Sequence, residues 1–299
     1  GEIPTPWHKS RSVDFFGGDL PGITQKLEYI ADLGATALYL TPIFKASSNH
    51  RYDIADYTIV DPHLGSDEAL AELRAALDAY GMQLMLDITP NHIGDMHHWF
   101  KKAQADPNAL EREYFFFDDQ TGACETWLGV PTLIKLNYTS PKLREVMYRA
   151  PDSALRRWLR PPYRIDSWRL DVSNMTGNLR MTQLDHEVHR EMRQALKADS
   201  ADLYILGEHF HDGTPHTQGE ELDATMNYQG FNIPVRRWLG GEDMGVADGH
   251  AHGDTSLMPT AAMAEQWQRF MAAVPYSIAL QQFNQLGSHD TTRILRVTK

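Results

Sequence analysis

Short apolar runs that alternate with amphipathic stretches are the feature of this sequence that most constrains its fold. Each run is too short for a helix and mostly apolar, as expected of strands covered on both faces of a parallel sheet. The runs are residues 35–40, 83–88, 167–172, 203–208, 224–228 and 283–288. Because strands that alternate with helices along a chain build parallel sheets, the pattern predicts an α/β fold.

Helical patterns lie between several of these runs. Residues 19–34 carry apolar side chains every three or four positions and end in glycine, and residues 66–81 begin with serine and also end in glycine. Ser140 and Pro141 open a third helical pattern, because serine caps a helix and proline suits its first position. The 299 residues suit either two ordinary domains or one α/β barrel.

The net charge, the apolar runs and the cysteine content limit which partners and which compartment we expect. The formal charge is -12, from 28 Lys and Arg against 40 Asp and Glu, which repels phosphate backbones and anionic lipid. No apolar run approaches the roughly 20 residues of a membrane span. We therefore expect no nucleic acid and no membrane as partners, and a neutral substrate. The single cysteine, Cys124, excludes an internal disulfide and fits a reducing compartment, so we expect a cytoplasmic protein.

One segment breaks the alternation of strands and helices. Residues 93–139 are rich in aromatic and acidic residues and show no clear period. Loops of that length are usually functional or form small subdomains. We therefore predict an insertion at 93–139, between an N-terminal barrel part at 1–92 and a C-terminal barrel part at 140–299.

Polar side chains gather where four of the predicted strands end. They are Asp87, Asn91, His92, Arg169, Asp171, Glu208, His209, His289 and Asp290. The carboxyl ends of parallel strands meet at one edge, where α/β enzymes build their active sites. A single aspartate at a strand end is more often a helix cap, and an Arg and Asp pair could be structural. Four such strand ends together favour a site.

The composition of this edge favours acid–base chemistry on a neutral ligand. Retaining glycoside hydrolysis uses one carboxylate as nucleophile and one carboxylic acid that first protonates the leaving oxygen and then activates water. The sequence has no Cys-rich metal cluster, no GxGxxG run and no GxxxxGK[ST] run, which argues against zinc, dinucleotide and phosphoryl-transfer chemistry.

Four segments carry a resemblance to a known family. "DITPNH", "WRLDVSN", "ILGEHF" and "NQLGSHD" are similar, in order, to the four signature regions of the α-amylase family of glycoside hydrolases. "FFGGDLPGI", "ALYLTPIF", "NHRYDIADY" and "MNYQGF" resemble the branch of maltodextrin glucosidases, cyclomaltodextrinases and neopullulanases. The resemblance implies a (β/α)8 barrel that hydrolyses α-glucosidic bonds in maltodextrins or related α-glucans with retention.

The resemblance also implies the catalytic residues. It makes Asp171 the nucleophile, Glu208 the general acid/base and Asp290 the carboxylate that stabilises the transition state. Arg169 lies on the same strand face as Asp171 and can hold it ionised. Glu208 must be protonated at the start of the reaction, which burial beside Phe210 would favour.

Further substrate contacts follow from the same resemblance. The predicted substrate-binding residues are Tyr52, Asp87, His92, Arg169, His209, His289 and Arg293. His92 and His289 are expected to bond the sugar at the point of cleavage, and Tyr52 to supply an apolar platform. His209 could instead cap the following helix. Trp127 could line the substrate cleft or pack within the insertion.

No cofactor is required, and a structural calcium ion is an alternative that is not favoured. Asn91 corresponds to a calcium ligand in many relatives, but a structural hydrogen bond explains this residue, and no other ligand set is visible. Asn174 stands where a histidine often follows the nucleophile, which affects binding of the leaving group.

The sequence shows fewer strands than the barrel that the resemblance implies. About six strands are evident where a closed barrel needs eight. We expect truncation at both ends, with the first and eighth strands missing, and a homodimer formed through domains absent from this chain. Three alternatives stay open for function: exo against endo hydrolysis, a transglycosylase or α-1,6-glucosidase on the same scaffold, and a non-catalytic carbohydrate-binding module.

Overall fold

The computed structural model describes residues 12–241 and 256–297. The chain divides into two units, of which unit 1 ends at Tyr204 and unit 2 begins at Ile205. The boundaries of the insertion at 93–139 follow the rhythm of the sequence and stay a prediction.

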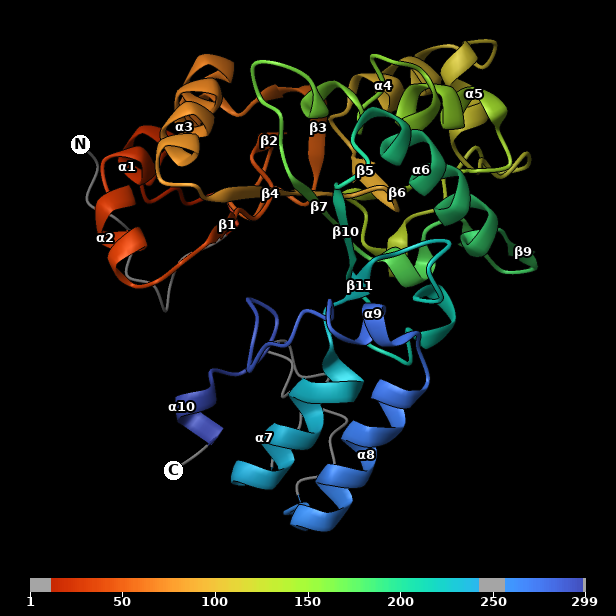
Figure 1. Cartoon of the computed structure of the whole chain (residues 1–299). Coiled ribbons are helices and arrows are strands. Elements are labelled where there is room, and N and C mark those ends of the chain that lie inside the picture. Colours follow the sequence, from red (N-terminus) through yellow and green to blue (C-terminus); the bar gives the residue numbers. More distant parts are fainter. Residues whose placement is uncertain (1–11, 242–255, 298–299) are drawn as a thin grey trace. The chain divides into compact units, whose positions relative to one another are not determined.

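Three parallel strands form the main sheet of unit 1 (Figure 1). They are β1 (Ala37–Tyr39), β4 (Gln83–Ile88) and β7 (Ser167–Leu170). β4 lies between the other two, and the register places Asp87 opposite Arg169. All residues of β7 and all but the first of β4 are buried, as the apolar runs at these positions predict.

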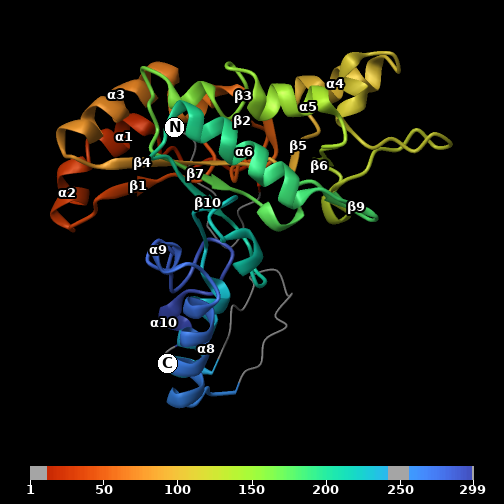
Figure 2. The same cartoon turned by 45° about the vertical axis from the view of Figure 1, so that its right-hand side comes forward.

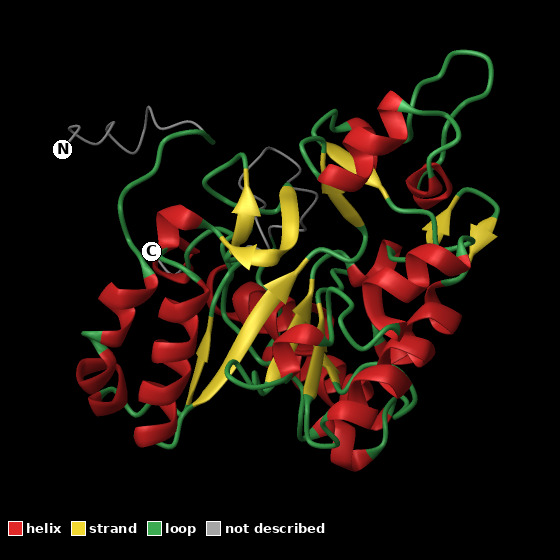
Figure 3. Ribbon diagram, turned by 90° about the horizontal axis from the view of Figure 1, so that it is seen from above, coloured by secondary structure: helices red, strands yellow, loops and turns green. Residues whose placement is uncertain are grey.

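The helices of unit 1 follow the predicted pattern with one difference. They are α1 (Leu20–Thr24), α2 (Leu27–Asp32), α3 (Asp67–Ala79), α4 (His98–Ala105), α5 (Pro141–Arg144) and α6 (Asp185–Asp199). Ser66 caps α3 by accepting a bond of 3.3 Å from the Ala69 amide, so the helix predicted there is confirmed. The pattern at 19–34 forms two short helices, because the turn breaks between Thr24 and Leu27. Figure 3 distinguishes these helices from the strands by colour.

Three antiparallel pairs of strands lie in the described part of unit 1. They are β2 (Phe44–Ala46) with β3 (Ile54–Val60), β5 (His92–Gly94) with β6 (Leu133–Lys135), and β8 (Asn178–Leu179) with β9 (Thr182–Gln183). Between β5 and β6 the chain forms α4 and two 3-10 helices, Leu110–Tyr114 and Trp127–Gly129. A Cβ atom on Gly94 would lie 2.3 Å from the Asp53 carbonyl oxygen, so only glycine allows β5 to pass this close.

The core of unit 1 lies on the face of β7 opposite the polar residues. Trp168 is fully buried, its ring centre lies 6.2 Å from that of Phe44, and its indole donates to the Leu155 carbonyl at 3.1 Å. Trp158 also packs against Phe44, with ring centres 5.1 Å apart. Trp168 and Arg169 are neighbours in a strand, so their side chains leave on opposite faces.

Unit 2 begins at the second residue of β10 (Tyr204–Gly207), which pairs in parallel with β11 (Ala224–Thr225). Its helices are α7 (Ile233–Gly240), α8 (Thr260–Ala272), α9 (Tyr276–Ala279) and α10 (Ile294–Val297). Figure 1 shows α7 beside α8, and Figure 2 shows α8 from another side. No helix in the described part of the chain has the length and apolarity to cross a bilayer.

The run at 283–288 forms no strand, unlike the other five predicted runs. It makes one parallel bridge, between Phe283 and Met226. The Gln285 carbonyl accepts a bond of 3.0 Å from the Asn232 side chain, and the Leu286 carbonyl accepts one of 2.9 Å from Arg236. Side chains therefore occupy carbonyls that a sheet ladder would use.

Candidate active site

Asp171 follows the last residue of β7 and is held there by Arg169. The Arg169 Nη1 atom donates to Asp171 Oδ1 at 2.6 Å and to both oxygens of Asp87 at 3.1 Å. Arg169 and Asp87 are fully buried, and 6% of Asp171 is exposed. One guanidinium thus joins two carboxylates, and this pairing offsets the cost of burying the charges.

Two tyrosines complete the environment of Asp87. Its Oδ2 accepts bonds from the Tyr39 hydroxyl at 2.7 Å and the Tyr52 hydroxyl at 2.9 Å. Burial raises the pKa of Asp87, and the bonds from Arg169 and the tyrosines act against that rise. Because four donor contacts occupy the Asp87 oxygens, this residue anchors Arg169 here, and a direct contact with substrate stays a prediction.

The backbone after Asp171 is strained. Val172 adopts φ 48° and ψ 44°, a left-handed conformation that costs a β-branched residue free energy. The chain turns there from β7 into the 3-10 helix Ser173–Met175. Backbone strain of this kind clusters at functional sites, where surrounding structure maintains it.

His92 reaches the same carboxylate from β5. Its Nε2 atom lies 3.8 Å from Asp171 Oδ2 and has no hydrogen-bond partner among the described residues. Trp127 stacks on the imidazole, with ring centres 5.4 Å apart and planes 20° apart. Burial, and then Lys135, lower the pKa of His92 to about 3, against a smaller opposing effect of the Tyr52 main chain. The imidazole is therefore neutral at physiological pH.

The sequence prediction missed two residues of this cluster, Tyr39 and Lys135. Lys135 is a lone cation in the apolar run "LIKL", the same signal that singled out Arg169. Its Nζ atom donates to the Asn91 side-chain oxygen and, at 2.7 Å, to the Met175 carbonyl. Burial lowers the pKa of Lys135 to about 7. Tyr39 lies at the end of β1, where the rule of carboxyl strand ends could have found it.

The surroundings of Asn91 do not suit calcium. Calcium in proteins takes six to eight oxygen ligands, several of them carboxylates. Here the Asn91 side-chain oxygen faces the Lys135 amine. A calcium ion at this oxygen would have to displace the hydrogen bond from Lys135.

Glu208 and His209 follow β10 in unit 2, and both are buried. The His209 ring lies 5.4 Å from that of His216, whose Nδ1 atom is 2.7 Å from Glu221 Oε2. Burial, and then His216, lower the pKa of His209 to about 4. Gly213, not His209, stands at the N-cap of the next helix, the 3-10 turn Thr214–His216, so the alternative that His209 caps this helix is wrong.

The last predicted residues lie around Ser288. His289 Nε2 is 3.2 Å from Asp290 Oδ2, and Arg293 donates to the Ser288 carbonyl at 2.8 Å. The Ser288 hydroxyl lies 3.2 Å from the Tyr228 hydroxyl, and the Tyr228 ring stacks on Phe210 at 4.6 Å. Phe210, expected beside Glu208, thus has an aromatic partner of its own.

The structure brings the predicted residues of unit 1 into one cluster. These are Tyr52, Asp87, His92, Arg169 and Asp171. The predicted residues of unit 2 are Glu208, His209, His289, Asp290 and Arg293. The assembly of carboxylates from both units into one site stays a prediction.

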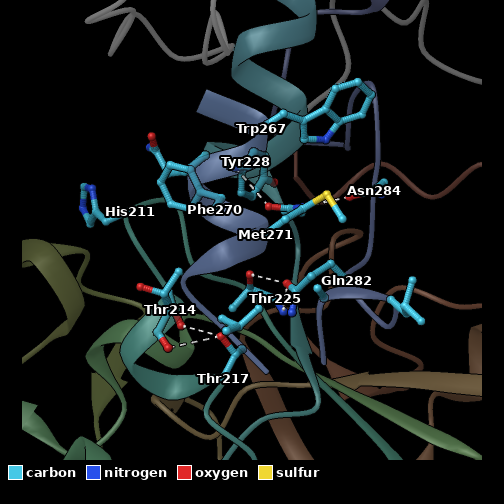
Figure 4. Close-up of a pocket in the computed structure, with 17 residues that line it drawn as sticks. His211, Thr214, Thr217, Thr225, Tyr228, Trp267, Phe270, Met271, Gln282 and Asn284 are labelled. Atoms are coloured by element: carbon cyan, nitrogen blue, oxygen red, sulfur yellow. Dashed lines mark hydrogen bonds between the residues drawn. The ribbon is translucent and has the colours of Figure 1, made fainter. Parts of the chain in front are cut away.

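A separate cavity of about 240 Å³ lies in unit 2, and none of the predicted site residues lines it. Trp267 and Phe270 of α8 form part of its wall (Figure 4). Its polar groups bond one another, since the Gln282 side-chain oxygen accepts from the Thr225 amide at 3.2 Å. No Asp, Glu, Lys or Arg is among its lining residues. The cavity therefore lacks the pair of carboxylates that glycoside hydrolysis needs, and His211 and Tyr228 are the titratable residues in its lining.

Carboxylates at the carboxyl ends of parallel strands define the class of α/β enzymes to which this chain is related. Residues 4–299 match the family model described as alpha amylase, catalytic domain. The chain therefore belongs to the alpha-amylase family of glycoside hydrolases, and its fold class is the (β/α)8 barrel. The predicted family and the barrel class are confirmed, and the truncation at both ends stays a prediction.

Individual relatives agree with the predicted branch. The chain is 36% identical over 303 residues to a cyclomaltodextrinase of Geobacillus thermopakistaniensis, covering 99% of this chain and 46% of that protein. It is 35% identical over 299 residues to an intracellular maltogenic amylase of Bacillus subtilis, covering 97% and 46%. Among solved structures, the cyclic alpha-maltosyl-(1→6)-maltose hydrolase of Arthrobacter globiformis in complex with maltose has a TM-score of 0.81 at 33% identity, covering 100% of this chain and 63% of that one. The chain spans about half the length of the curated relatives it matches.

Proposed function

We propose that the protein hydrolyses α-glucosidic bonds in maltodextrins or related α-glucans, with retention of anomeric configuration. The observation that carries the proposal is Asp171, a buried carboxylate bonded on one oxygen by Arg169 at 2.6 Å. The cation favours the ionised form that a nucleophile needs. The rigid strand β7 sets its position, and family membership supplies the substrate class.

The reaction would proceed in two steps. Asp171 attacks the anomeric carbon and the leaving oxygen takes a proton from Glu208, which gives a glycosyl-enzyme ester. Glu208 then removes a proton from water, which attacks the ester and frees Asp171. Asp290 would hold sugar hydroxyls and stabilise the transition state. His92 would donate from Nε2 to a hydroxyl of the sugar bound beside Asp171.

The Arthrobacter relative supports a second candidate for the linkage. Its name describes a hydrolase of a cyclic substrate with α-1,6 bonds. A glucosidase for α-1,6 bonds uses the same carboxylates, so the two candidates differ only in which linkage the cleft accepts. Transglycosylation would differ only in the acceptor, a sugar hydroxyl in place of water.

The deciding experiment tests three substrates on the parent protein and on an Asp171→Asn variant. Maltotriose, a cyclic maltodextrin and panose are incubated with the protein, and the products and their anomers are identified. We expect cleavage with retention, and a loss of about a thousandfold or more in Asp171→Asn. Asp119→Asn, an exposed aspartate of unit 1, is the matched control and should keep full activity.

The identity of the preferred substrate distinguishes exo-acting hydrolysis, endo-acting hydrolysis and hydrolysis of α-1,6 bonds. Binding of these sugars without cleavage by the parent protein would instead support a carbohydrate-binding module. Inversion of configuration would contradict a covalent intermediate on Asp171.

We also propose that the protein needs no calcium at Asn91 and works in the cytoplasm. The first is supported by the Lys135 contact with Asn91. The second is supported by the single cysteine and by the name of the Bacillus subtilis relative, an intracellular enzyme.

A further inference from the structure

Lys135 is a buried basic residue for which the proposed reaction has no direct use. It lies in β6 opposite His92 of β5, and only 2% of its surface is exposed. Its Nζ atom contacts two carbonyl oxygens, one of the Asn91 side chain and one of the Met175 main chain. Because carbonyl oxygens only accept hydrogen bonds, Nζ donates to both, whether or not the amine is charged.

This donation determines which way the Asn91 amide faces. With its oxygen on Lys135, the amide nitrogen Nδ2 lies on the other side, 3.1 Å from His92 Nδ1. An amide NH₂ group only donates, so in this contact His92 Nδ1 accepts, and the main-chain acceptor of Tyr52 is the group that competes for a proton of the ring. A neutral imidazole that accepts at Nδ1 carries its proton on Nε2.

The proton on Nε2 then points to the reactive carboxylate. Nε2 is buried, 3.8 Å from Asp171 Oδ2, and has no hydrogen-bond partner among the described residues. That distance is too long for a hydrogen bond. A buried donor without a partner costs free energy, and a ligand hydroxyl beside Asp171 would satisfy it.

The second bond of Lys135 acts on the plane of the same ring. The main-chain carbonyl of Met175 accepts a hydrogen bond from Lys135. The side-chain sulfur of Met175 accepts one from the Trp127 indole at 3.3 Å. Trp127 in turn stacks on His92. The Lys135 amine is thus linked to the edge of the His92 ring by hydrogen bonds through Asn91. It is linked to the face of that ring through Met175 and the stacked Trp127.

We propose that Lys135 is a positioning residue that acts through Asn91 to keep His92 in its Nε2–H tautomer, which aims a donor at ligand bound beside Asp171. The identity of that ligand rests on the proposed function. The tautomer does not, because it is a property of the protein without substrate. Without the Lys135 donor, the Asn91 amide is free to turn, and its oxygen would favour the Nδ1–H tautomer.

The tautomer is measured by NMR on the full chain labelled with ¹⁵N-histidine. The signals of His92 are identified as those that disappear in the His92→Gln variant. We expect neutral His92 with its proton on Nε2 in the parent, and a shift toward Nδ1–H in Lys135→Met. Lys142→Met, the same change at an exposed lysine of unit 1, should leave the His92 signals unchanged.

A second variant covers the case in which Lys135→Met does not fold. Asn91→Asp keeps the shape of the side chain and the contact with Lys135. The amide nitrogen that faced His92 Nδ1 becomes a carboxylate oxygen, which can only accept a hydrogen bond. The proton should therefore move to Nδ1. A parent protein with Nδ1–H or a charged imidazole at pH 7 would overturn the proposal. So would an unchanged Nε2–H tautomer in folded Lys135→Met or in Asn91→Asp.

Kinetics separate positioning from a general structural effect. Lys135→Met should lower kcat/KM by about 10- to 100-fold, the effect of one misplaced hydrogen bond. In a His92→Gln background it should cause no further loss, because the two residues act as one unit. Equal losses in both backgrounds would contradict action through His92. If the parent cleaves none of the substrates, the proposed function fails while the tautomer measurement stands.

Discussion

At the scale of single residues, the cluster around Arg169 shows why a polar side chain is tolerated in a buried strand. Its guanidinium pairs with Asp87 and Asp171, and Asp87 also accepts from Tyr39 and Tyr52. A buried charge is costly unless it is paired and hydrogen-bonded, and here each pairing serves that end. The sequence alone predicted the Arg169 and Asp171 pair, because two residues apart in a strand means one face.

His92 predicts a dependence of stability on pH. Its pKa is about 3 in the folded protein, against about 6.5 for an ordinary histidine. Between these values the unfolded chain binds a proton that the folded protein does not. Stability from this group is therefore complete above about pH 6.5 and is lost as the pH falls toward 3.

Urea denaturation of the parent and of His92→Gln between pH 4 and 6 tests this dependence. The unfolding free energy of the parent should rise with pH more steeply, by up to about 1.4 kcal/mol per pH unit, the value for one proton. Above pH 7 the slopes of the two proteins should agree. Parallel slopes between pH 4 and 6 would show that His92 titrates alike in both states.

At the scale of elements, the strands of unit 1 carry different chemistry at their two ends. The carboxyl ends of β1, β4 and β7 hold the cluster of Tyr39, Asp87 and Asp171. Near the amino ends, Arg74 of α3 donates to Asp166 Oδ2 at 2.6 Å, and the same oxygen accepts from the Leu84 amide at 2.7 Å. Arg74 thus joins α3 to the start of β4 and the start of β7. We interpret the first end as functional and the second as structural.

Arg74→Met should reduce stability without changing the kinetics. Arg74 is 3% exposed and also bonds Asp78 and the Met82 carbonyl. Its loss should lower the unfolding free energy by about 2 kcal/mol, less than for a fully buried pair because water reaches both carboxylates. Arg164→Met removes an exposed partner of the same Asp78 and should cost below about 1 kcal/mol.

Urea denaturation gives both free energies, and kcat/KM on the preferred substrate gives the activity. A large loss of kcat/KM in folded Arg74→Met would contradict the division of the strands into a functional and a structural end.

At the scale of the whole molecule, the net charge of -12 agrees with the proposed substrate, a neutral α-glucan. The acidic surface gives no attraction for nucleic acid. The proposal that no calcium binds at Asn91, whose side-chain oxygen accepts from Lys135, predicts how the chain responds to removal of metal.

Dialysis against EDTA should leave the thermal midpoint of the protein unchanged, and so should addition of calcium after dialysis. A ligand that binds only the folded state raises its stability, so a calcium site would appear as a rise in the midpoint with calcium. Differential scanning calorimetry on the full chain measures this. A midpoint that falls with EDTA and returns with calcium would contradict the proposal.

The sequence by itself determined the α/β class, five of the parallel strands and the candidate carboxylates. These follow from local patterns: apolar runs of strand length, glycine and serine at helix ends, and polar residues at the carboxyl ends of strands. It did not predict the break in the helix at 19–34 or the absence of a strand at 283–288. In the second case, bonds from Asn232 and Arg236 decided the outcome, and these residues are about 50 positions away.

Only the tertiary structure decided the partners of the buried polar groups. Tyr39 reaches Asp87 across 48 positions, and Lys135 reaches Asn91 across 44. No spacing in the sequence indicates such pairs, because they depend on the register of β1, β4, β5 and β6. The sequence therefore sets which chemical groups are available, and packing sets which of them meet, since a buried donor or acceptor must find its partner in space.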